Sequence, residues 1–169
     1  SQPLLARGHA LSIIDRDAEA IRDASDFGFK VWYGDGTRLD ILHAAGAGQA
    51  AVIVVAPDSR EAVSKIVELA KHEFPQVPVL ARAFDRAHAV ELRAAGVDFQ
   101  IRETFESAMV LGREALLALG ESPEDVEDIM AAARARDADR LVLDQAEGFR
   151  AGASLIIGNK DLPAGALTA

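Results

Sequence analysis

The sequence contains no cysteine among its 169 residues. This absence excludes disulfide bonds and thiolate chemistry, and it is consistent with a reducing compartment. No apolar run approaches the roughly 18–20 residues that a membrane-spanning helix requires. The first residues also lack the basic and then apolar pattern of a signal peptide. We therefore expect any role at a membrane to depend on a partner or on chain outside this sequence.

Positive charge is scarce as well: 18 Lys and Arg residues face 27 Asp and Glu residues, and the formal net charge is -9 at pH 7. Nucleic-acid-binding proteins present clustered basic side chains to phosphates, so no nucleic-acid partner is expected. The four histidines show no metal-ligand spacing, and each is expected at the surface rather than at a metal. The composition therefore predicts neither a metal site nor a polyanion-binding surface.

The sequence does contain a regular alternation of short apolar runs and helical patterns. The apolar runs predict strands near 10–15, 29–33, 51–56, 78–82 and 98–101. The run at 51–56, AVIVVA, is apolar on both faces, which is typical of a strand in a parallel sheet covered by helices on both sides. The alternation predicts an α/β fold with a Rossmann-like, doubly wound parallel sheet.

Capping residues between these runs predict the helices. They are expected at 17–26, after a cap at Thr37, from Asp58 and Ser59 to about Phe74, and from Asp85 through Leu92.

After Arg102 the alternation gives way to two long helices, one at 103–119 and one from Ser122 to about 146. Ser122 is followed by a proline and two acids, a favourable first turn. We therefore divide the chain into an α/β domain at 1–102, a helical arm at 103–150 and a disordered tail at 151–169.

Two positions at the ends of predicted strands are candidates for ligand binding. Asp15 ends the first run, where a carboxylate can accept hydrogen bonds from ribose hydroxyls, but it can equally start the following helix. At 33–37 the sequence reads YGDGT; Gly36 lets backbone approach a planar ligand, and Asp35 or Thr37 can bond to an adenine edge. An ordinary turn in which Thr37 caps a helix explains the same residues, so both interpretations stay open.

Arg102 ends the last predicted strand. The carboxyl edge of a parallel sheet faces the ligand crevice, where a guanidinium can bind a phosphate or carboxylate through two hydrogen bonds. The alternative is an ion pair within the domain, with Glu103 or Glu106. From the residues alone we favour the ion pair.

The sequence shows no catalytic constellation. Ser12 lacks the flanking glycines of a nucleophile elbow, and Tyr33 has no lysine four residues later. The phosphate-binding pattern G-x-x-x-x-G-K-[ST] is missing too. We therefore predict that the chain is not an enzyme.

Four segments, taken in order, resemble the RCK (TrkA-N) nucleotide-binding domain, most closely the version at the C-terminus of Kef-type glutathione-regulated potassium-efflux antiporters. They are IIDRD at 13–17, FGFKVWYGDGTRLDILHAAGA at 27–47, HEFPQVPVLARAFDRAHAVELRAAGVD at 72–98 and RETFESA at 102–108. RETFE before a long helix is typical of the efflux antiporters rather than of potassium channels. The resemblance covers roughly residues 4–120.

In the family that this chain resembles, a first strand ends in G-x-G-x-x-G and the pyrophosphate sits on the next helix. The opening residues SQPLLARGHA look like the remainder of that helix, so the strand and its glycines are expected upstream of Ser1. A sheet without that strand leaves two neighbours unpaired, and the chain as it stands is expected to bind nucleotide poorly.

The resemblance also implies roles for particular residues. AMP or NAD(H) would be bound by Asp15, Arg16, Asp35, Gly36, Thr37 and Ala56. Arg102 would contact glutathione or its adducts at the interface of a homodimer, and the arm at 103–150 would serve dimerisation. The other implied partners are the membrane antiporter domain, upstream in the same native chain, and an ancillary oxidoreductase subunit.

Taken together, the resemblance implies a ligand-operated gate on potassium:proton antiport, located on the cytoplasmic side of the bacterial inner membrane. Two alternatives belong to other classes. One is a stand-alone nucleotide-binding subunit of a potassium channel or uptake system, which RETFE and the long acidic helices disfavour. The other is an NAD-dependent oxidoreductase, which the missing acid–base pair and the missing second domain disfavour.

Overall fold

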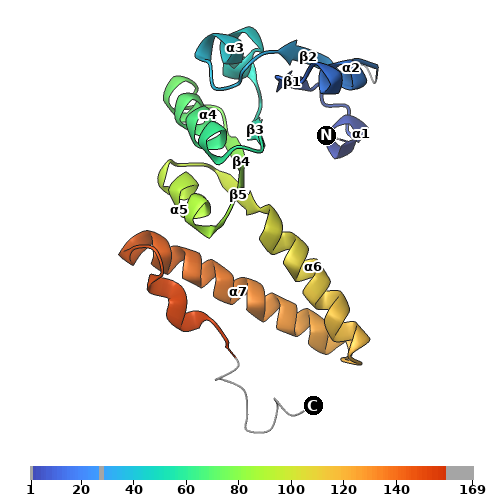
Figure 1. Cartoon of the computed structure of the whole chain (residues 1–169), viewed down its shortest axis with the longest axis vertical. Helices are drawn as coiled ribbons and strands as arrows, with labels where there is room; N and C mark the ends of the chain where they lie inside the picture. The colour runs from blue at the N-terminus through green and yellow to red at the C-terminus, as the bar shows by residue number, and fades with distance from the viewer. Residues whose placement is uncertain (1, 27–28, 159–169) are drawn as a thin grey trace.

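The computed structural model describes residues 2–26 and 29–158 (Figure 1). Strands and helices alternate through the first hundred residues, and two long helices follow, as the sequence predicts. The elements are α1 (Gln2–Ala6), β1 (Ser12–Asp15), α2 (Ala18–Asp26), β2 (Lys30–Tyr33), α3 (Leu39–Ala44), η1 (Ala47–Gln49), β3 (Ile53–Val55), α4 (Arg60–Glu73), β4 (Val79–Ala83), α5 (Arg86–Ala94), β5 (Phe99–Arg102), α6 (Glu103–Ala118), α7 (Pro123–Glu147) and η2 (Ala151–Leu155).

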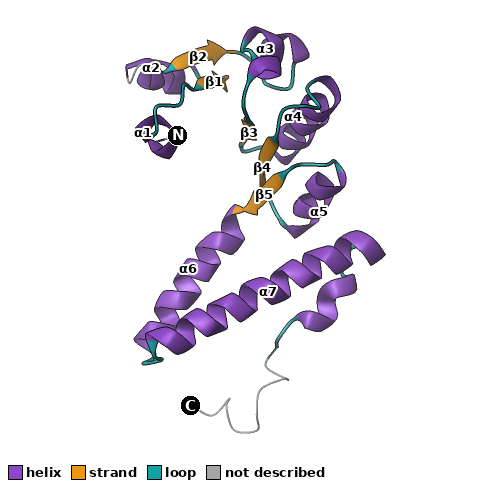
Figure 2. Ribbon diagram, turned by 180° about the vertical axis from the view of Figure 1, so that it is seen from behind, coloured by secondary structure: helices purple, strands orange, loops and turns teal. Residues whose placement is uncertain are grey.

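The strands are all parallel, but in the described part of the chain they form two sheets instead of the single sheet expected. One sheet has the order β1-β2, with Ser12 beside Lys30, and the other has the order β3-β4-β5. Figure 2 shows the two sheets apart, joined by the connection through α3. The physical reason is that no strand of the described residues pairs with both β1 and β3, so the two ladders are not joined.

The hydrophobic core lies between the three-stranded sheet and the helices α4 and α5. Side chains alternate along β4 so that every second one is buried, and the helices turn their apolar faces to these positions. The core side chains with almost no exposure are Val55, Val63, Val67, Ala70, Phe74, Val77, Val79, Ala81, Ala83, Ala89 and Leu92.

The opposite face of this sheet is open. Val54 is 61% exposed and Phe99 is 57% exposed. The ladder registers place Val54 beside Leu80 and Leu80 beside Phe99, so these apolar side chains form one row across the strands. The expectation that residues 51–56 are covered on both faces is therefore wrong for the described residues, because only α4 and α5 cover the sheet.

Three of the predicted helix caps are confirmed. The side chains of Ser59, Asp85 and Ser122 accept hydrogen bonds from the first turns of α4, α5 and α7. Thr37 is not a cap: Arg38 precedes α3, and the Thr37 hydroxyl donates to Asp35 instead.

The helical arm folds back on the α/β domain. Helix α6 runs away from β5, and α7 returns beneath α5, so that α7 contacts both helices (Figure 1). The tail expected at 151–169 is ordered at its start, because η2 packs on α7 and Gly152 lies against the Arg140 backbone. A side chain at Gly152 would meet that backbone at 2.8 Å, so only glycine fits there. Residues 159–169 lie outside the described residues.

One histidine departs from its expected place at the surface. His88 is fully buried on α5, where it faces α4, while the other three histidines are exposed. The Phe84 backbone N–H donates to His88 Nδ1 at 3.1 Å. Nδ1 therefore carries no proton, and Nε2 donates to Ser64 Oγ at 3.1 Å. Burial, together with the nearby Arg60, lowers the pKa of His88 below its ordinary value.

Candidate functional site

The carboxyl ends of β1 and β2 bring together most of the residues predicted to bind nucleotide. Asp15 ends β1, and its Oδ1 accepts a hydrogen bond from the Asp17 backbone N–H at 2.9 Å. This contact lies in the turn before α2, and the acid that caps the helix is Asp17, whose Oδ1 accepts from the Glu19 backbone N–H at 2.8 Å. The interaction uses one carboxylate oxygen of Asp15.

Asp35 is the centre of a second group at this edge. Its Oδ1 accepts hydrogen bonds from the Thr37 backbone N–H at 2.9 Å and from the Thr37 hydroxyl at 2.7 Å. Its Oδ2 lies 3.5 Å from Arg16 Nη1. The hydrogen bonds from Thr37, with the charge of Arg16, hold the pKa of Asp35 below its ordinary value. The loop is therefore a preformed anionic turn.

Packing accounts for the glycine in this loop. A Cβ on Gly36 would lie 3.3 Å from Ile66 Cδ1 and 4.0 Å from Ile14 Cγ2, so Gly36 gives close contact to α4 and β1. Ala56 follows β3 and is exposed, but it belongs to the other sheet. The structure thus joins Arg16 with Asp35, Gly36 and Thr37 and places Ala56 on a different sheet.

Arg102 lies at the junction of β5 and α6, and its partner is a residue that the sequence did not single out. Its guanidinium forms an ion pair with Asp137 of α7, and only 10% of the side chain is exposed. The Phe105 ring lies 4.3 Å from Arg102 Cζ and supports the guanidinium through a cation–π contact. The expected ion pair within the chain is therefore present, but it joins the α/β domain to the arm, and the partner is neither Glu103 nor Glu106.

Those two glutamates pair elsewhere. Glu103 Oε2 accepts from Arg82 at 2.8 Å, and Glu106 accepts from Arg134 of α7 at 2.8 and 3.0 Å. Both pairs are substantially exposed, so they add little to stability.

Asp137 belongs to a buried network of alternating charge. It accepts hydrogen bonds from both Arg102 and Arg86, the first residue of α5. Arg86 Nη1 also lies 3.5 Å from Asp144 Oδ2. The Asp144 side chain is only 1% exposed, and its Oδ1 accepts from the Gly152 backbone N–H at 3.0 Å. Two arginines of the α/β domain thus hold two aspartates of α7.

The sequence carried a faint signal for this network. Asp137 and Asp144 are seven residues apart with Leu141 between them at helical spacing, so all three share one face of α7. Leu141 is buried, which identifies that face as the inner one. The apolar residue between these two acids was the clue to their burial.

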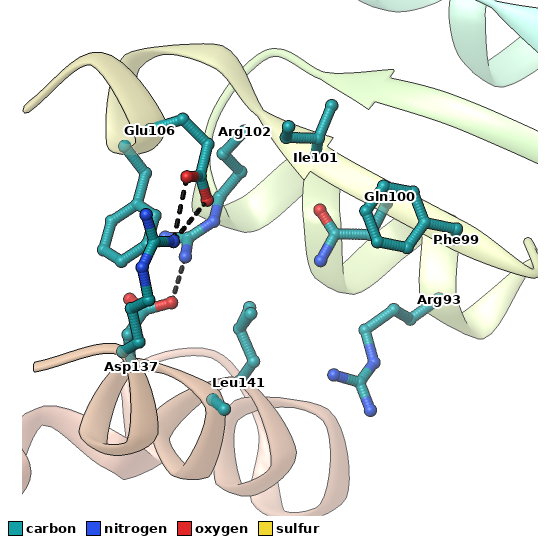
Figure 3. A pocket seen from close by; sticks show the side chains of 11 residues that line it. Arg93, Phe99, Gln100, Ile101, Arg102, Glu106, Asp137 and Leu141 are labelled. Atoms are coloured by element: carbon teal, nitrogen blue, oxygen red, sulfur yellow. Dashed lines mark hydrogen bonds and ion pairs between the residues drawn. The ribbon is translucent and has the colours of Figure 1, made fainter. Parts of the chain in front are cut away.

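A cavity of about 290 Å³ lies beside Arg102, between β5, α6 and α7 (Figure 3). Three arginines reach its wall, namely Arg93, Arg102 and Arg134. Gln100 lines it too, and its buried Oε1 has no hydrogen-bond partner. Guanidinium groups bind carboxylates and phosphates, and the free amide oxygen can accept from a ligand N–H. Two of the three arginines already hold a carboxylate of this chain, because Asp137 and Glu106 line the same cavity and pair with Arg102 and Arg134.

Metal binding and membrane crossing find no support in the part of the chain that the structure describes. No cluster of three His, Asp or Glu side chains there is placed to hold a metal ion. Among residues 2–26 and 29–158, no helix has the length and apolar character needed to span a bilayer.

Comparison with known sequences gives a consistent result. Residues 2–103 match the TrkA-N domain model. The glutathione-regulated potassium-efflux system protein of Haemophilus influenzae is 44% identical over 148 residues, which make up 88% of this chain and 24% of that protein. KefC of Salmonella arizonae, named as a protein of the same system, is 45% identical over 69% of this chain and 19% of that protein. The chain therefore spans about a quarter or less of the length of these curated relatives.

Among solved structures, the Kef CTD of Shewanella denitrificans in its AMP-bound form is 40% identical to this chain. The likeness covers 86% of this chain and 89% of that one, with a TM-score of 0.79. It therefore extends beyond residues 2–103, which the domain model matches.

Proposed function

The chain belongs to the TrkA-N domain family, and on that premise we propose that it is the ligand-binding regulatory domain of a potassium:proton antiporter of the glutathione-regulated efflux type. The observation that carries the proposal is the likeness to Kef CTD, which takes in 86% of this chain. Identity of 44% to a potassium-efflux system protein supports the same class. The chain acts by binding ligands and changing shape, and no residue is assigned a catalytic role.

The first proposed ligand is a nucleotide, AMP or NAD(H), at the carboxyl ends of β1, β2 and β3. Asp15 would bind the ribose hydroxyls, and the turn formed by Asp35 and Thr37 would lie near the adenine, with Arg16, Gly36 and Ala56 beside them. The AMP-bound form of Kef CTD supports AMP. We propose further that a strand pairs with the free edges of β1 and β3 and supplies the glycine-loop amides that hold phosphate.

The second proposed ligand is glutathione or an adduct of it, held through Arg102. The cavity beside Arg102 presents the chemistry that this peptide needs, since arginines suit its carboxylates and the Gln100 amide oxygen suits its N–H groups. Arg102 also lies where the α/β domain meets the arm, so a ligand there can alter how the two are joined.

The proposed mechanism is a shift between two arrangements of the arm. A ligand that binds one arrangement more tightly raises its population, and an attached membrane domain responds. The proposed partners are a second copy of this chain through α6 and α7, the antiporter domain of the same native chain, and an ancillary oxidoreductase subunit. This assembly places the chain on the cytoplasmic side of the bacterial inner membrane.

A chimeric transporter tests the regulatory role. The matched 148-residue segment of the Haemophilus influenzae relative is replaced by this chain, and potassium efflux from cells is recorded while a glutathione adduct is added. We expect efflux to respond to the adduct. Arg102→Ala should weaken ligand binding by about 1.5–3 kcal/mol, so that more adduct is needed for the same efflux. Arg102→Lys should restore the response only in part, because an ammonium cannot form a two-pronged contact with a carboxylate.

Arg113→Ala is the matched control, because this arginine lies on α6 and forms only exposed ion pairs with glutamates. The response of this variant should be that of the unaltered chimera. A chimera that ignores the adduct would contradict the regulatory role. An unchanged dose response in Arg102→Ala would contradict the site but leave the role intact.

Calorimetry tests the nucleotide site. With the relative's preceding strand and loop fused to this chain, Asp15→Ala should weaken AMP binding by about 1–3 kcal/mol, since ribose hydroxyls lose their acceptor. Asp23→Ala removes an exposed acid from α2 and should leave AMP affinity unchanged. Equal dissociation constants for Asp15→Ala and the parent would mean that Asp15 serves only the turn before α2.

A further inference from the structure

The guanidinium proposed to bind a ligand is already occupied by a carboxylate of the same chain. Arg102 and Asp137 are 10% and 12% exposed, and they form a close ion pair. Arg102 Nη2 donates to Asp137 Oδ2. An external anion that takes this nitrogen of Arg102 has to displace the Asp137 carboxylate.

The network offers Asp137 another partner when it does. Arg86 binds the other carboxylate oxygen of Asp137, so loss of Arg102 would not leave a buried aspartate unpaired. Arg86 itself remains tied to Asp144, which also accepts from Gly152. Removing one member of a buried pair is costly when its partner is left uncompensated, and this arrangement avoids that penalty.

The residues around Arg102 favour replacement of Asp137 by a ligand over simple breaking of the ion pair. The Phe105 ring keeps the Arg102 guanidinium in place, so the arginine does not have to follow α7. The cavity of about 290 Å³ opens beside it, with Arg93 and Arg134 on its wall (Figure 3). A ligand can therefore reach Arg102 from the cavity while Asp137 still holds it.

We propose that Asp137 is an intramolecular competitor for the anionic ligand of Arg102. The ligand carboxylate replaces the Asp137 carboxylate, and the middle of α7 is released from the end of β5. Arg86, Asp144 and η2 retain the C-terminal end of α7 on α5. The inference rests on the proposed function in one respect, namely that Arg102 binds an anion.

The test compares glutathione binding to the 169-residue chain and three variants by calorimetry, with S-methylglutathione as a second probe. Asp137→Asn keeps the shape of the side chain but removes its charge, so glutathione should bind about tenfold more tightly or better, the equivalent of losing one charge-assisted competitor. Asp139→Asn is the matched control, because it makes the same charge change at an exposed position of α7 and should bind as the parent does. Arg102→Ala should lose binding.

The outcomes separate the two proposals. Equal or weaker glutathione binding by Asp137→Asn, with binding still lost in Arg102→Ala, overturns the competition and leaves the anion site standing. Binding that survives Arg102→Ala, or no binding by any form, overturns both.

A second measurement needs no variant and covers the case in which Asp137→Asn does not fold. Hydrogen exchange of the unaltered chain is followed with and without glutathione. Competition predicts faster exchange of the amides around residue 137 when glutathione is bound, while the amides near Asp144 and Gly152 keep their protection. Slower exchange around residue 137 on binding would overturn the proposal.

Discussion

The two halves of the α/β domain use the same β-α pattern but differ in how well they are packed. Around β1 and β2, none of the side chains before Leu42 whose exposure the structure describes is buried. In the other half, every second side chain of β4 is buried in the core with α4 and α5, and Val55 of β3 is buried with them. The difference follows from pairing, since β4 has a partner on both edges whereas β1 has one. The local sequence pattern is enough to form a strand, whereas a buried core forms around a strand that is paired on both edges.

The ion pairs differ in the same way. Arg38 and Asp40, at the start of α3, form a two-pronged pair at 3.1 and 2.9 Å, but the side chains are 66% and 63% exposed. Arg86 and Asp144 lie 3.5 Å apart with exposures of 15% and 1%. The Arg38–Asp40 pair has the better geometry but contributes less to stability, because water screens it.

The largest expected effect comes from breaking the buried pair. Arg86→Ala leaves Asp144 without its charged partner and takes one arginine from Asp137, and the free energy of unfolding should fall by about 3–5 kcal/mol. Arg38→Ala, the matched change in the exposed pair, should cost at most about 1 kcal/mol. Urea unfolding measures both. Similar losses for the two variants would show that packing around these pairs does not differ in solution.

Trp32 provides a probe of the weaker half alone. The single tryptophan lies on β2, and its Nε1 donates to Ser12 Oγ at 2.9 Å, so its fluorescence reports on the two-stranded sheet. We expect the fluorescence transition to occur at lower urea concentration than the loss of helical circular dichroism. Coincident transitions would mean that the halves unfold as one cooperative unit.

His88 should make the packed half sensitive to acid. Its lowered pKa means that the folded state favours the neutral ring, so the unfolded state binds more protons as the pH falls. The contribution of neutral His88 to the free energy of unfolding is fully present above the ordinary pKa of 6.5. It should decline progressively below that pH, until the lower pKa of the folded state is passed. His88→Gln should flatten this decline in urea titrations between pH 7 and pH 5. An equally steep decline in the variant would mean that other titrating groups cause the loss of stability.

The smallest effect is expected in the loop after β2. Thr37→Val removes the hydroxyl that donates to Asp35 while the backbone donor remains. The pKa of Asp35 should rise toward its ordinary value, and stability should change by less than about 1 kcal/mol. Carboxyl titration by NMR measures the shift. A pKa of Asp35 that does not move would mean that the backbone N–H and Arg16 account for the lowering.

Much of the fold was predictable because it depends on local pattern. Apolar runs identified every strand to within a few residues, and Ser59, Asp85 and Ser122 marked helix starts correctly. Thr37 was misassigned because a hydroxyl can serve either a helix start or the preceding acid, and Asp35 lies two residues away. His88 was misassigned because helical position alone does not say which neighbour a side chain will face.

The site was only half predictable. Asp15 and Arg102 end strands and Asp35 follows one, and position at the end of a parallel strand can be predicted from the sequence. Their partners come from elsewhere: Arg102 meets Asp137, 35 residues away, and Arg86 meets Asp144, 58 residues away. No spacing rule spans such separations, because they depend on α7 turning back beneath α5.

Residue order was enough to establish an α/β chain, its helix starts, its family resemblance and the strand-end positions of its polar residues. Propensity, capping and hydrophobic period act over a few residues, so they are contained in the sequence itself. The division into two sheets, the burial of His88 and the pairing of Asp137 with two arginines were decided by tertiary structure. Each depends on which surfaces meet, and the free energy of a charge or an imidazole is set by the neighbours that exclude water from it.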